Sequence, residues 1–408
     1  MYLKVLILIA TLISNVALSS DHSKYQWIQY VHDNQLVARA TTLENTCPII
    51  IIDQQAFEMN FRTDYEDIEL KEKVRICEYN VTQAKSVFIN NKYLKLPPKQ
   101  IKRFIIIGDT GCESSVFDKK HTHQNCEDKN AWPFEKIANK IADSNPDFVI
   151  HMGDYGYRNK YKIEEDAIKN QNMQWFFFRE DFFKPAEKLL KKAPMIFIRG
   201  NHESCKLTGR AWFLFLDAQA YNKDCLEQSP TYNLSIDGLN LVVFDSSGTI
   251  SGLDFSKDQL DKYKVQFSDI AKKLKEPSWL LIHQPIISLK QLSEEEKFPS
   301  NLAAPLINQA FGESFTKKMP FAISGHFHLM AHVIRKSDKF EQFIFGNGGT
   351  SIHKANHVSY PYTNKEEEGE VRVKYGYTQF DRVDVNKWQV TVYDLEGREL
   401  FSKEISNK

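Results

Sequence analysis

The chain has 408 residues, of which 42% are hydrophobic and 26% are charged, a balance typical of a soluble globular protein. A chain of this length can bury a large core, and two domains are the expectation. Its 53 Lys and Arg residues are matched by 53 Asp and Glu residues. Without a basic excess to neutralise phosphates, the composition argues against nucleic acid as a partner.

The first twenty residues, MYLKVLILIATLISNVALSS, combine one cation, Lys4, with an apolar run over residues 5–13. This run is too short to cross a bilayer core of ~30 Å. Residues 1–19 are therefore predicted to be a signal peptide cleaved after Ser19; a retained anchor or a core strand is the alternative. With no second apolar span, we expect a secreted or periplasmic protein without a stable membrane anchor. Six cysteines, an even number, fit an oxidising compartment.

Residues 20–97 contain short β-like runs such as LVARATT and KVRICEYNV, separated by polar turns and without a helical period. This pattern predicts a small β-sandwich domain. The sequence KLPPK at residues 95–99 then interrupts any regular element, because proline has no N–H for a strand ladder and restricts the residue before it. A domain boundary is therefore expected at residue 97.

Residues 98–408 alternate apolar strands with amphipathic helices, a pattern typical of an α/β domain. The predicted strands cover 104–108, 148–152, 195–198, 239–244, 279–282, 321–324 and 343–345. Helical patterns cover 131–144, 172–192, 256–275 and 302–318. Beyond Tyr377 the sequence alternates with period two and predicts antiparallel strands.

Five of these strands end in residues that can bind metal ions. In chain order the fragments are GDTG with Asp109, GDYGY with Asp154 and Tyr157, GNHE with Asn201 and His202, IHQP with His283, and GHFH with His326 and His328. Each fragment alone is a weak signal, because a histidine at a strand end is more often structural. Five in series are hard to produce by chance, and strand ends of an α/β sheet meet in one crevice. The series therefore predicts a single site.

This order of motifs, over about residues 104–350, resembles the calcineurin-like metallophosphoesterase superfamily and, within it, the purple acid phosphatases. The resemblance implies an α/β, four-layer metallophosphoesterase fold, with two β-sheets flanked by helices, beside the small N-terminal β-sandwich. It also implies two metal ions. The first would be held by Asp109, Asp154, Tyr157 and His328, and the second by Asp154, Asn201, His283 and His326.

One position departs from many metal-dependent phosphoesterases, in which a histidine follows two residues after the first aspartate. This chain has Gly111 there, whereas Tyr157 stands three residues after Asp154, the spacing of the tyrosine ligand in purple acid phosphatases. A phenol of ordinary pKa ~10 is deprotonated at working pH only beside a strongly charged ion. This favours Fe(III) in the first site with divalent Zn, Mn or Fe in the second. In the alternative, Tyr157 only packs under the sheet.

The resemblance implies a hydrolase of small phosphoesters, with phosphate monoesters as first-choice substrates attacked by a metal-bound hydroxide. His202 would protonate the leaving oxygen or contact the phosphoryl group, with support of the ligands as the alternative. The runner-up is a phosphodiesterase acting on nucleotide or lipid head groups, and the third hypothesis is a non-catalytic secreted metal-binding protein. After GHFH the chain continues with Leu329 and Met330, unlike the purple acid phosphatases, so the substrate preference stays open.

The order of the cysteines favours local pairing among the 15 connectivities that six cysteines allow. Two lie in the proposed sandwich, and two others each follow a metal motif and have one later cysteine before the next motif. The expected disulfides are Cys47–Cys77, Cys112–Cys126 and Cys205–Cys225.

Several further residues keep two interpretations. Arg158 and Arg199 border the motifs and can contact phosphate or form structural ion pairs. Asn80 and Asn233 begin the sequons NVT and NLS, which are glycosylation acceptors only in a host that glycosylates. Four more histidines are predicted to be loop residues rather than ligands of extra metal ions, namely His121, His123, His353 and His357.

Overall fold

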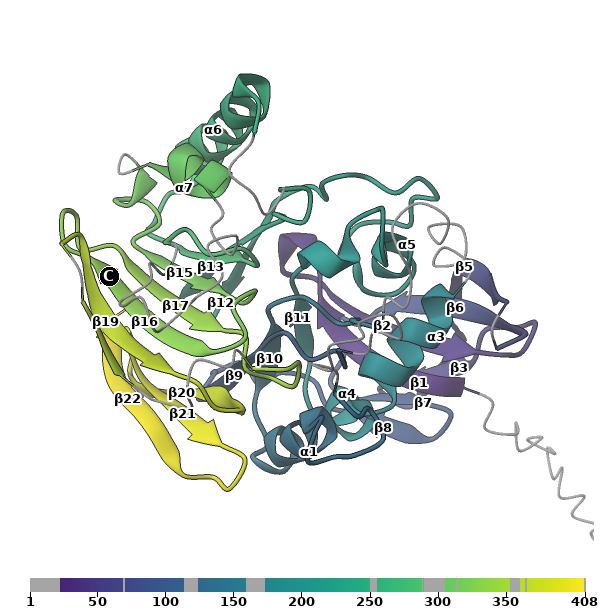
Figure 1. The fold of residues 1–408 in the computed structure, drawn as a ribbon. Helices are drawn as coiled ribbons and strands as arrows, with labels where there is room; N and C mark the ends of the chain where they lie inside the picture. The colour runs from purple at the N-terminus through teal and green to yellow at the C-terminus, as the bar shows by residue number, and fades with distance from the viewer. Residues whose placement is uncertain are drawn as a thin grey trace, which may run out of the picture.

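The computed structural model describes residues 23–68, 70–113, 124–158, 173–249, 255–287, 289, 305–312, 315–352, 360–363 and 365–406. Two large β-sheets with helices beside them make up most of this part of the chain (Figure 1). None of the helices described is long and apolar enough to span a membrane. The predicted signal peptide and four loop histidines lie outside the described residues: 1–19, His121, His123, His353 and His357.

The first large sheet is built around three of the predicted strands. Its ten strands run in the order β22-β21-β20-β9-β10-β11-β1-β2-β6-β5. The predicted strands pair in parallel at its centre, as β9 (Arg103–Ile107), β10 (Phe148–His151) and β11 (Met195–Phe197). The C-terminal strands continue the sheet antiparallel, as the alternation beyond Tyr377 predicts, through β20 (Gly376–Asp384), β21 (Lys387–Asp394) and β22 (Glu399–Ser406).

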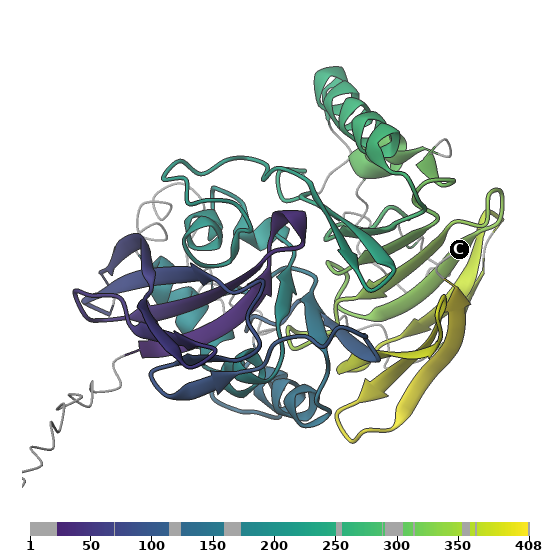
Figure 2. The same ribbon diagram turned by 180° about the vertical axis from the view of Figure 1, so that it is seen from behind.

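The N-terminal strands extend this same sheet instead of forming the expected separate sandwich over residues 20–97 (Figure 2). β1 (Ser23–Tyr30) pairs in parallel with β11, with Gln29 opposite Met195. The strands beyond it are β2 (Leu36–Thr42), β6 (Glu72–Asn80) and β5 (Asn60–Asp67). Ile28 of β1 and Phe104 of β9 belong to one hydrophobic core. The residues before and after the boundary expected at residue 97 are therefore packed together and do not form separate domains.

A small third sheet accounts for the remaining N-terminal strands. Its order is β4-β3-β7-β8, and all three pairings are antiparallel. Ile50, Val87 and Leu94 from this sheet are buried in the same core as Ile28. Its strands are β3 (Ile49–Ile52), β4 (Gln55–Glu58), β7 (Val87–Ile89) and β8 (Lys92–Leu94).

The second large sheet has eight strands in the order β12-β13-β14-β15-β17-β16-β19-β18. Four of them pair in parallel and cover predicted apolar runs: β13 (Leu239–Phe244), β14 (Trp279–Ile282), β15 (Phe321–Ser324) and β17 (Glu341–Phe345). The other four pair antiparallel and were not predicted: β12 (Tyr232–Ile236), β16 (Met330–Arg335), β18 (Tyr360–Thr363) and β19 (Glu367–Arg372). β19, with the sequence EEGEVR, carries no apolar run that would mark it as a strand.

Alternating side chains of the strands divide the hydrophobic core into layers. Phe104 and Ile106 of β9 face the second sheet, whereas Ile105 and Ile107 face the helices. The helical elements on the first sheet are α1 (Phe134–Asp143), α3 (Gln174–Phe178), the π-turn η2 (Arg179–Phe183), α4 (Glu187–Lys192), α5 (Gly209–Ala211) and the π-turn η4 (Trp212–Leu216). Those on the second are α6 (Lys257–Lys273) and α7 (Pro305–Phe311). This order of helix, sheet, sheet and helix confirms the predicted four-layer fold.

The three predicted disulfides are all present and leave no free cysteine. The three are Cys47–Cys77, Cys112–Cys126 and Cys205–Cys225. Cys112–Cys126 follows the metal motif of Asp109, and Cys205–Cys225 follows that of Asn201.

Candidate metal centre

The phenol of Tyr157 lies at the meeting point of the residues predicted to hold the first metal. Its Oη is 2.6 Å from Asp154 Oδ2, 2.9 Å from His328 Nε2 and 3.1 Å from Asp109 Oδ1. These four residues follow three different strands, β9, β10 and β15. The fold therefore brings all four predicted ligands of this set together at the carboxyl ends of parallel strands, as α/β sheets place their sites.

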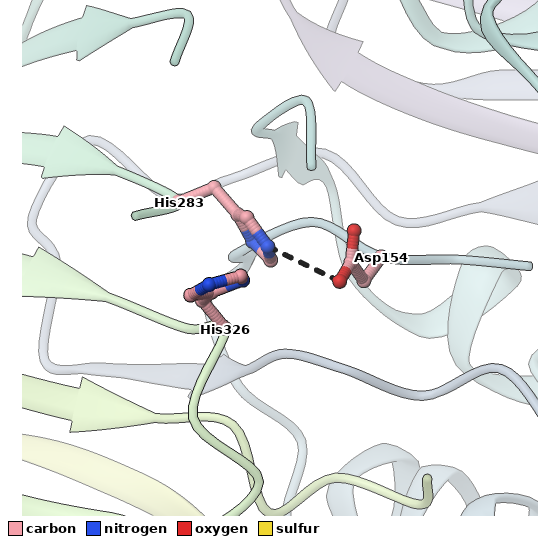
Figure 3. Close-up of side chains that lie close together, drawn as sticks. All are labelled: Asp154, His283 and His326. Carbon is pink, nitrogen blue, oxygen red and sulfur yellow. Dashed lines mark ion pairs between the residues drawn. The ribbon is translucent and has the colours of Figure 1, made fainter. Parts of the chain in front are cut away.

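The residues predicted to hold the second metal also converge, on the other side of Asp154. His283 Nε2 lies 3.0 Å from Asn201 Oδ1 and 3.2 Å from Asp154 Oδ2. Ligand atoms of Asp154, His283 and His326 all lie within 4.8 Å of one another (Figure 3). Asp154 Oδ2 thus touches one residue of each set, so this carboxylate is placed to be shared by two ions.

The backbone turns sharply at three of these residues. Asp109, Asp154 and His326 have φ values of 56°, 59° and 71°. Left-handed backbone at residues other than glycine costs of order 1–3 kcal/mol each. Gly200 lets the backbone approach the carboxylate, because a Cβ there would lie 2.1 Å from Asp154 Oδ1. The loops are therefore shaped around the carboxylates.

The structure shows why position 111 is a glycine and not the histidine found in many metal-dependent phosphoesterases. A Cβ at this position would lie 2.8 Å from Cδ2 of Tyr157 and 2.7 Å from the carbonyl oxygen of Tyr155. Real Cβ atoms do not approach other heavy atoms so closely, so any side chain here would displace the GDYGY loop. The glycine and the tyrosine are sterically linked, because the ring of Tyr157 fills the space that a side chain at 111 would need.

Hydrogen bonds fix the orientation of two of the histidines. His283 Nδ1 lies 2.6 Å from the carbonyl oxygen of Met152, and His328 Nδ1 lies 2.9 Å from that of Ser351. In a neutral imidazole, a proton on Nδ1 leaves Nε2 with a lone pair directed into the site, the arrangement in which imidazoles bind metals. Without a cation, and despite the burial of His283, Asp154 raises the pKa of this imidazole to about 10, so its Nε2 then carries a proton that a metal ion would replace. The glycine-rich segment GNGGT at residues 346–350 also reaches the centre, since Thr350 N donates to the carbonyl oxygen of Asp109 at 2.9 Å.

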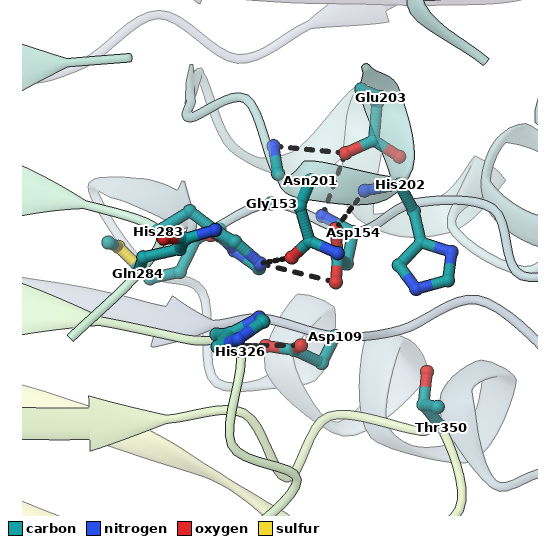
Figure 4. Close-up of polar contacts among 12 residues, drawn as sticks. Asp109, Gly153, Asp154, Asn201, His202, Glu203, His283, Gln284, His326 and Thr350 are labelled. Atoms are coloured by element: carbon teal, nitrogen blue, oxygen red, sulfur yellow. Dashed lines mark hydrogen bonds and ion pairs between the residues drawn. The ribbon is translucent and has the colours of Figure 1, made fainter. Parts of the chain in front are cut away.

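Glu203 connects two of the loops, in line with the expectation from the sequence that this residue orients the GNHE loop or a group that supports the ligands. Its side chain is fully buried and accepts the backbone N–H of Asp154 at 2.9 Å (Figure 4). It also accepts the backbone N–H groups of Tyr155 at 2.9 Å and of Gly200 at 3.0 Å. Burial, reinforced by the charge of Asp154, raises the pKa of this carboxyl to about 8. The only signal in the sequence is its place in GNHE, from which its three partners cannot be read.

The electrostatics of the site favour a bound cation. Burial, together with the Asp154 and Asp109 carboxylates, raises the pKa of Tyr157 well above its ordinary value. Burial also raises the pKa of Asp109 to about 7. Burial and the neighbouring His283 lower the pKa of His326 to about 3, so this imidazole is neutral at neutral pH and keeps the lone pair of one ring nitrogen. Carboxylate, phenol, amide and imidazole donors suit Fe, Mn and Zn, so the residues present fit metal ions.

His202 stands beside the two ligand groups rather than within them. Its ring centroid is 3.9 Å from that of Tyr157, and its backbone N donates to Asp154 Oδ1 at 2.9 Å. Burial lowers the pKa of this imidazole. A catalytic role for His202 therefore stays a prediction, but its side chain lies next to the group that would bind substrate.

The two arginines that border the motifs are engaged in ion pairs. Arg199 is 1% exposed, pairs with Asp245 at 3.0 Å and donates from Nε to the carbonyl oxygen of Glu203 at 2.9 Å. Arg158 pairs with the buried carboxylate of Asp181. Arg199 therefore forms a structural ion pair and does not face a phosphate, because its guanidinium is buried and binds Asp245 and the backbone of the GNHE loop.

Comparison with known proteins gives a family model and solved structures but no match among curated proteins. The family model, described as calcineurin-like phosphoesterase, matches residues 102–330, more than half of the chain. The purple acid phosphatase PPD1 from yellow lupin (Lupinus luteus) seeds has a TM-score of 0.60 at 12% identity, over 94% of this chain and 74% of that one. GAP50, the anchor in the inner membrane complex of Plasmodium, has a TM-score of 0.42 at 16% identity, over 75% and 89%. The lupin enzyme shares the fold, and the family match includes every predicted metal ligand: the chain belongs to the calcineurin-like phosphoesterase family.

Proposed function

We propose that this protein is an exported phosphatase that hydrolyses phosphate monoesters with the help of two metal ions. The observation that carries the proposal is the position of Asp154. Its Oδ2 lies 2.6 Å from Tyr157 Oη and 3.2 Å from His283 Nε2, between the two groups of predicted ligands. A carboxylate shared in this way is what a pair of ions acting on one phosphoryl group requires.

Two bound cations would supply charge to stabilise the phosphoryl oxygens and would lower the pKa of a bound water. The first would be held by Asp109, Asp154, Tyr157 and His328, and the second by Asp154, Asn201, His283 and His326. Without a cation, the phenol of Tyr157 keeps its proton, because its pKa is raised. The phenol then donates a hydrogen bond to Asp154 Oδ2. Loss of this proton on loading favours a trivalent ion, so Fe(III) with divalent Zn, Mn or Fe is the proposed pair.

His202 is proposed to act on the substrate. Its ring packs on Tyr157, which holds the imidazole at the edge of the ligand groups. From there an imidazole N–H can hold a phosphoryl oxygen or protonate the leaving oxygen. The three disulfides, with every cysteine paired, support export to an oxidising compartment.

The test is a comparison of p-nitrophenyl phosphate with bis-p-nitrophenyl phosphate, on mature protein whose metals have been measured. We expect two equivalents of metal and faster hydrolysis of the monoester. Asp154→Asn should lose metal and nearly all turnover, whereas Asp143→Asn, whose exposed side chain on α1 pairs with Lys188, should retain both. Faster hydrolysis of the diester would establish a phosphodiesterase instead. Bound metal without either activity would establish a metal-binding protein.

A further inference from the structure

Asn233 lies at an exposed position in the first strand of the second sheet. β12 is an edge strand and pairs only with β13, with Asn233 opposite Val242. Its side chains alternate, so that Asn233 and Ser235 are exposed and Leu234 between them is buried. The side chain of Asn233 makes no hydrogen bond to the described residues, while Ser235 Oγ donates to Asn240 at 2.8 Å. The sequon NLS thus presents its asparagine and its hydroxyl on one open face.

A cleft of about 620 Å³ opens beside this asparagine. Its walls come from the turn η1 (His32–Asn34), which lies against β12, from the segment before that strand and from one face of α6. The volume is within the range of ligand pockets, about 300–1,000 Å³. Asn233 itself is part of the lining.

The lining of this cleft suits a neutral polar molecule. Gln228 and Gln266 bridge it through reciprocal amide hydrogen bonds of 2.9 and 2.7 Å. The charged residues of the lining are Asp33, Asp269 and Lys273, so acidic groups outnumber the one lysine and do not favour a phosphate. Amides and carboxylates are partners for hydroxyl and acetamido groups, which both donate and accept hydrogen bonds.

We propose that Asn233 carries an N-linked glycan and that its first sugars lie in this cleft, against Gln266, Asp269 and Lys273. The inference rests on the proposed export, because the modification occurs in the secretory pathway. A series of hydrogen bonds and an ion pair also connects Ser229, in one wall of the cleft, to the GNHE loop of the metal centre. Ser229 N donates to Asp245 Oδ2 at 2.5 Å, and Asp245 pairs with Arg199, which binds the carbonyl oxygen of Glu203. Sugars in the cleft would therefore steady the segment that supports the GNHE loop.

Occupancy is tested by secreting the protein from a glycosylating host and measuring intact mass and glycopeptides. Asn233→Gln and Ser235→Ala should each remove the same glycan. Asn222→Gln, an exposed asparagine with Asp224 in place of the hydroxyl residue, should remove none. Replacing residues 1–19 with the host's own signal peptide separates the two proposals. A protein that is secreted but unmodified at Asn233 overturns the glycan proposal. A protein that is secreted with the host's signal peptide but not with its natural residues 1–19 overturns the proposed export.

Placement in the cleft is tested on the folded protein by the rate of glycan release by a peptide N-glycosidase, an amidase that hydrolyses the bond between the asparagine and the first sugar. Asp269→Ala, which removes a partner inside the cleft, should speed release about fivefold, the change expected for one lost hydrogen bond. Lys264→Ala, at an exposed position of α6 outside the cleft, should leave the rate unchanged. Equal rates for the wild type and both variants would show that the sugars extend into solvent, and would overturn this part of the proposal.

Discussion

Replacing Glu203 with glutamine keeps the size of the side chain but turns one acceptor oxygen into an NH₂ group. In the wild type, Oε2 accepts from Asp154 and Gly200, and Oε1 accepts from Tyr155. An amide can place its oxygen at only one of these positions, so at least one buried N–H then faces another donor. Even a protonated carboxyl keeps a lone pair on each oxygen, whereas the amide nitrogen offers none.

One unsatisfied buried donor costs ~1–3 kcal/mol, so Glu203→Gln should lower the free energy of unfolding by that amount. The measurement is the midpoint of urea unfolding at constant slope. Glu135→Gln is the matched control, because this surface residue on α1 loses only an ion pair with Lys129, worth ~0–1 kcal/mol. Equal midpoints for the wild type and Glu203→Gln would refute the three-donor account.

The pH dependence gives a second readout in metal-free protein. Burial raises the pKa of Glu203 from 4.5 to about 8, so the folded protein binds this proton more tightly than the unfolded chain does. The corresponding stability is fully present below pH 4.5 and is lost as the pH rises through 8. The difference between wild type and Glu203→Gln should therefore shrink over this interval, and a difference that grows would contradict the raised pKa.

Four further changes have defined outcomes. Tyr157→Phe should abolish the visible charge-transfer band of an iron-loaded protein; a preparation without iron or colour but with full activity would return this tyrosine to a packing role. His202→Ala should slow alkyl phosphates more than p-nitrophenyl phosphate, since poor leaving groups depend most on a proton, and equal losses would indicate positioning. Gly111→Ala should lower metal content by displacing the ring of Tyr157, as metal analysis can check. His332→Gln should flatten the loss of stability below pH 6.5, because burial lowers the pKa of this histidine and only the unfolded chain takes up its proton there; parallel profiles in acid unfolding would count against it.

The parallel strands could be predicted because each is buried on both faces and therefore appears in the sequence as a short, continuous apolar run. Residues 239–244 and 279–282 are apolar runs, and each forms a strand with those limits. The N-terminal region shows the limit of this reasoning. The run LVARATT predicts the strand at residues 36–42, but β1 before it was not predicted, and the pairing of Gln29 with Met195 depends on contacts far along the chain.

Helices form in all four predicted segments, but one pattern does not give a single continuous helix. The run 172–192 looks like one amphipathic helix, yet it divides at the π-turn over Arg179–Phe183. Phe182 and Phe183 in this turn are fully buried against the first sheet. Burying both of these adjacent rings takes the wider turn, a requirement that periodicity alone does not reveal.

The candidate site divides in the same way. Asp109, Asp154 and the histidines were predictable because each ends an apolar strand, and Tyr157 because of its spacing from Asp154. The partners of Glu203 and the space kept by Gly111 were not, since both depend on how separate loops approach one another. Sequence thus identifies groups that can bind a metal more readily than the groups that hold them in place.

The parallel pairing of β1 with β11 has a consequence for synthesis on the ribosome. β1 and β2 can pair as soon as they emerge, but the other edge of β1 must wait until Met195 has been made. Closing so long a loop is slow, and an open strand edge is prone to pair with other chains. A nascent chain that stalls before residue 195 therefore exposes this edge, and a fragment that starts at residue 98 leaves β11 paired with β10 alone. The first strand therefore gains both of its neighbours only when almost half of the 408 residues have been made.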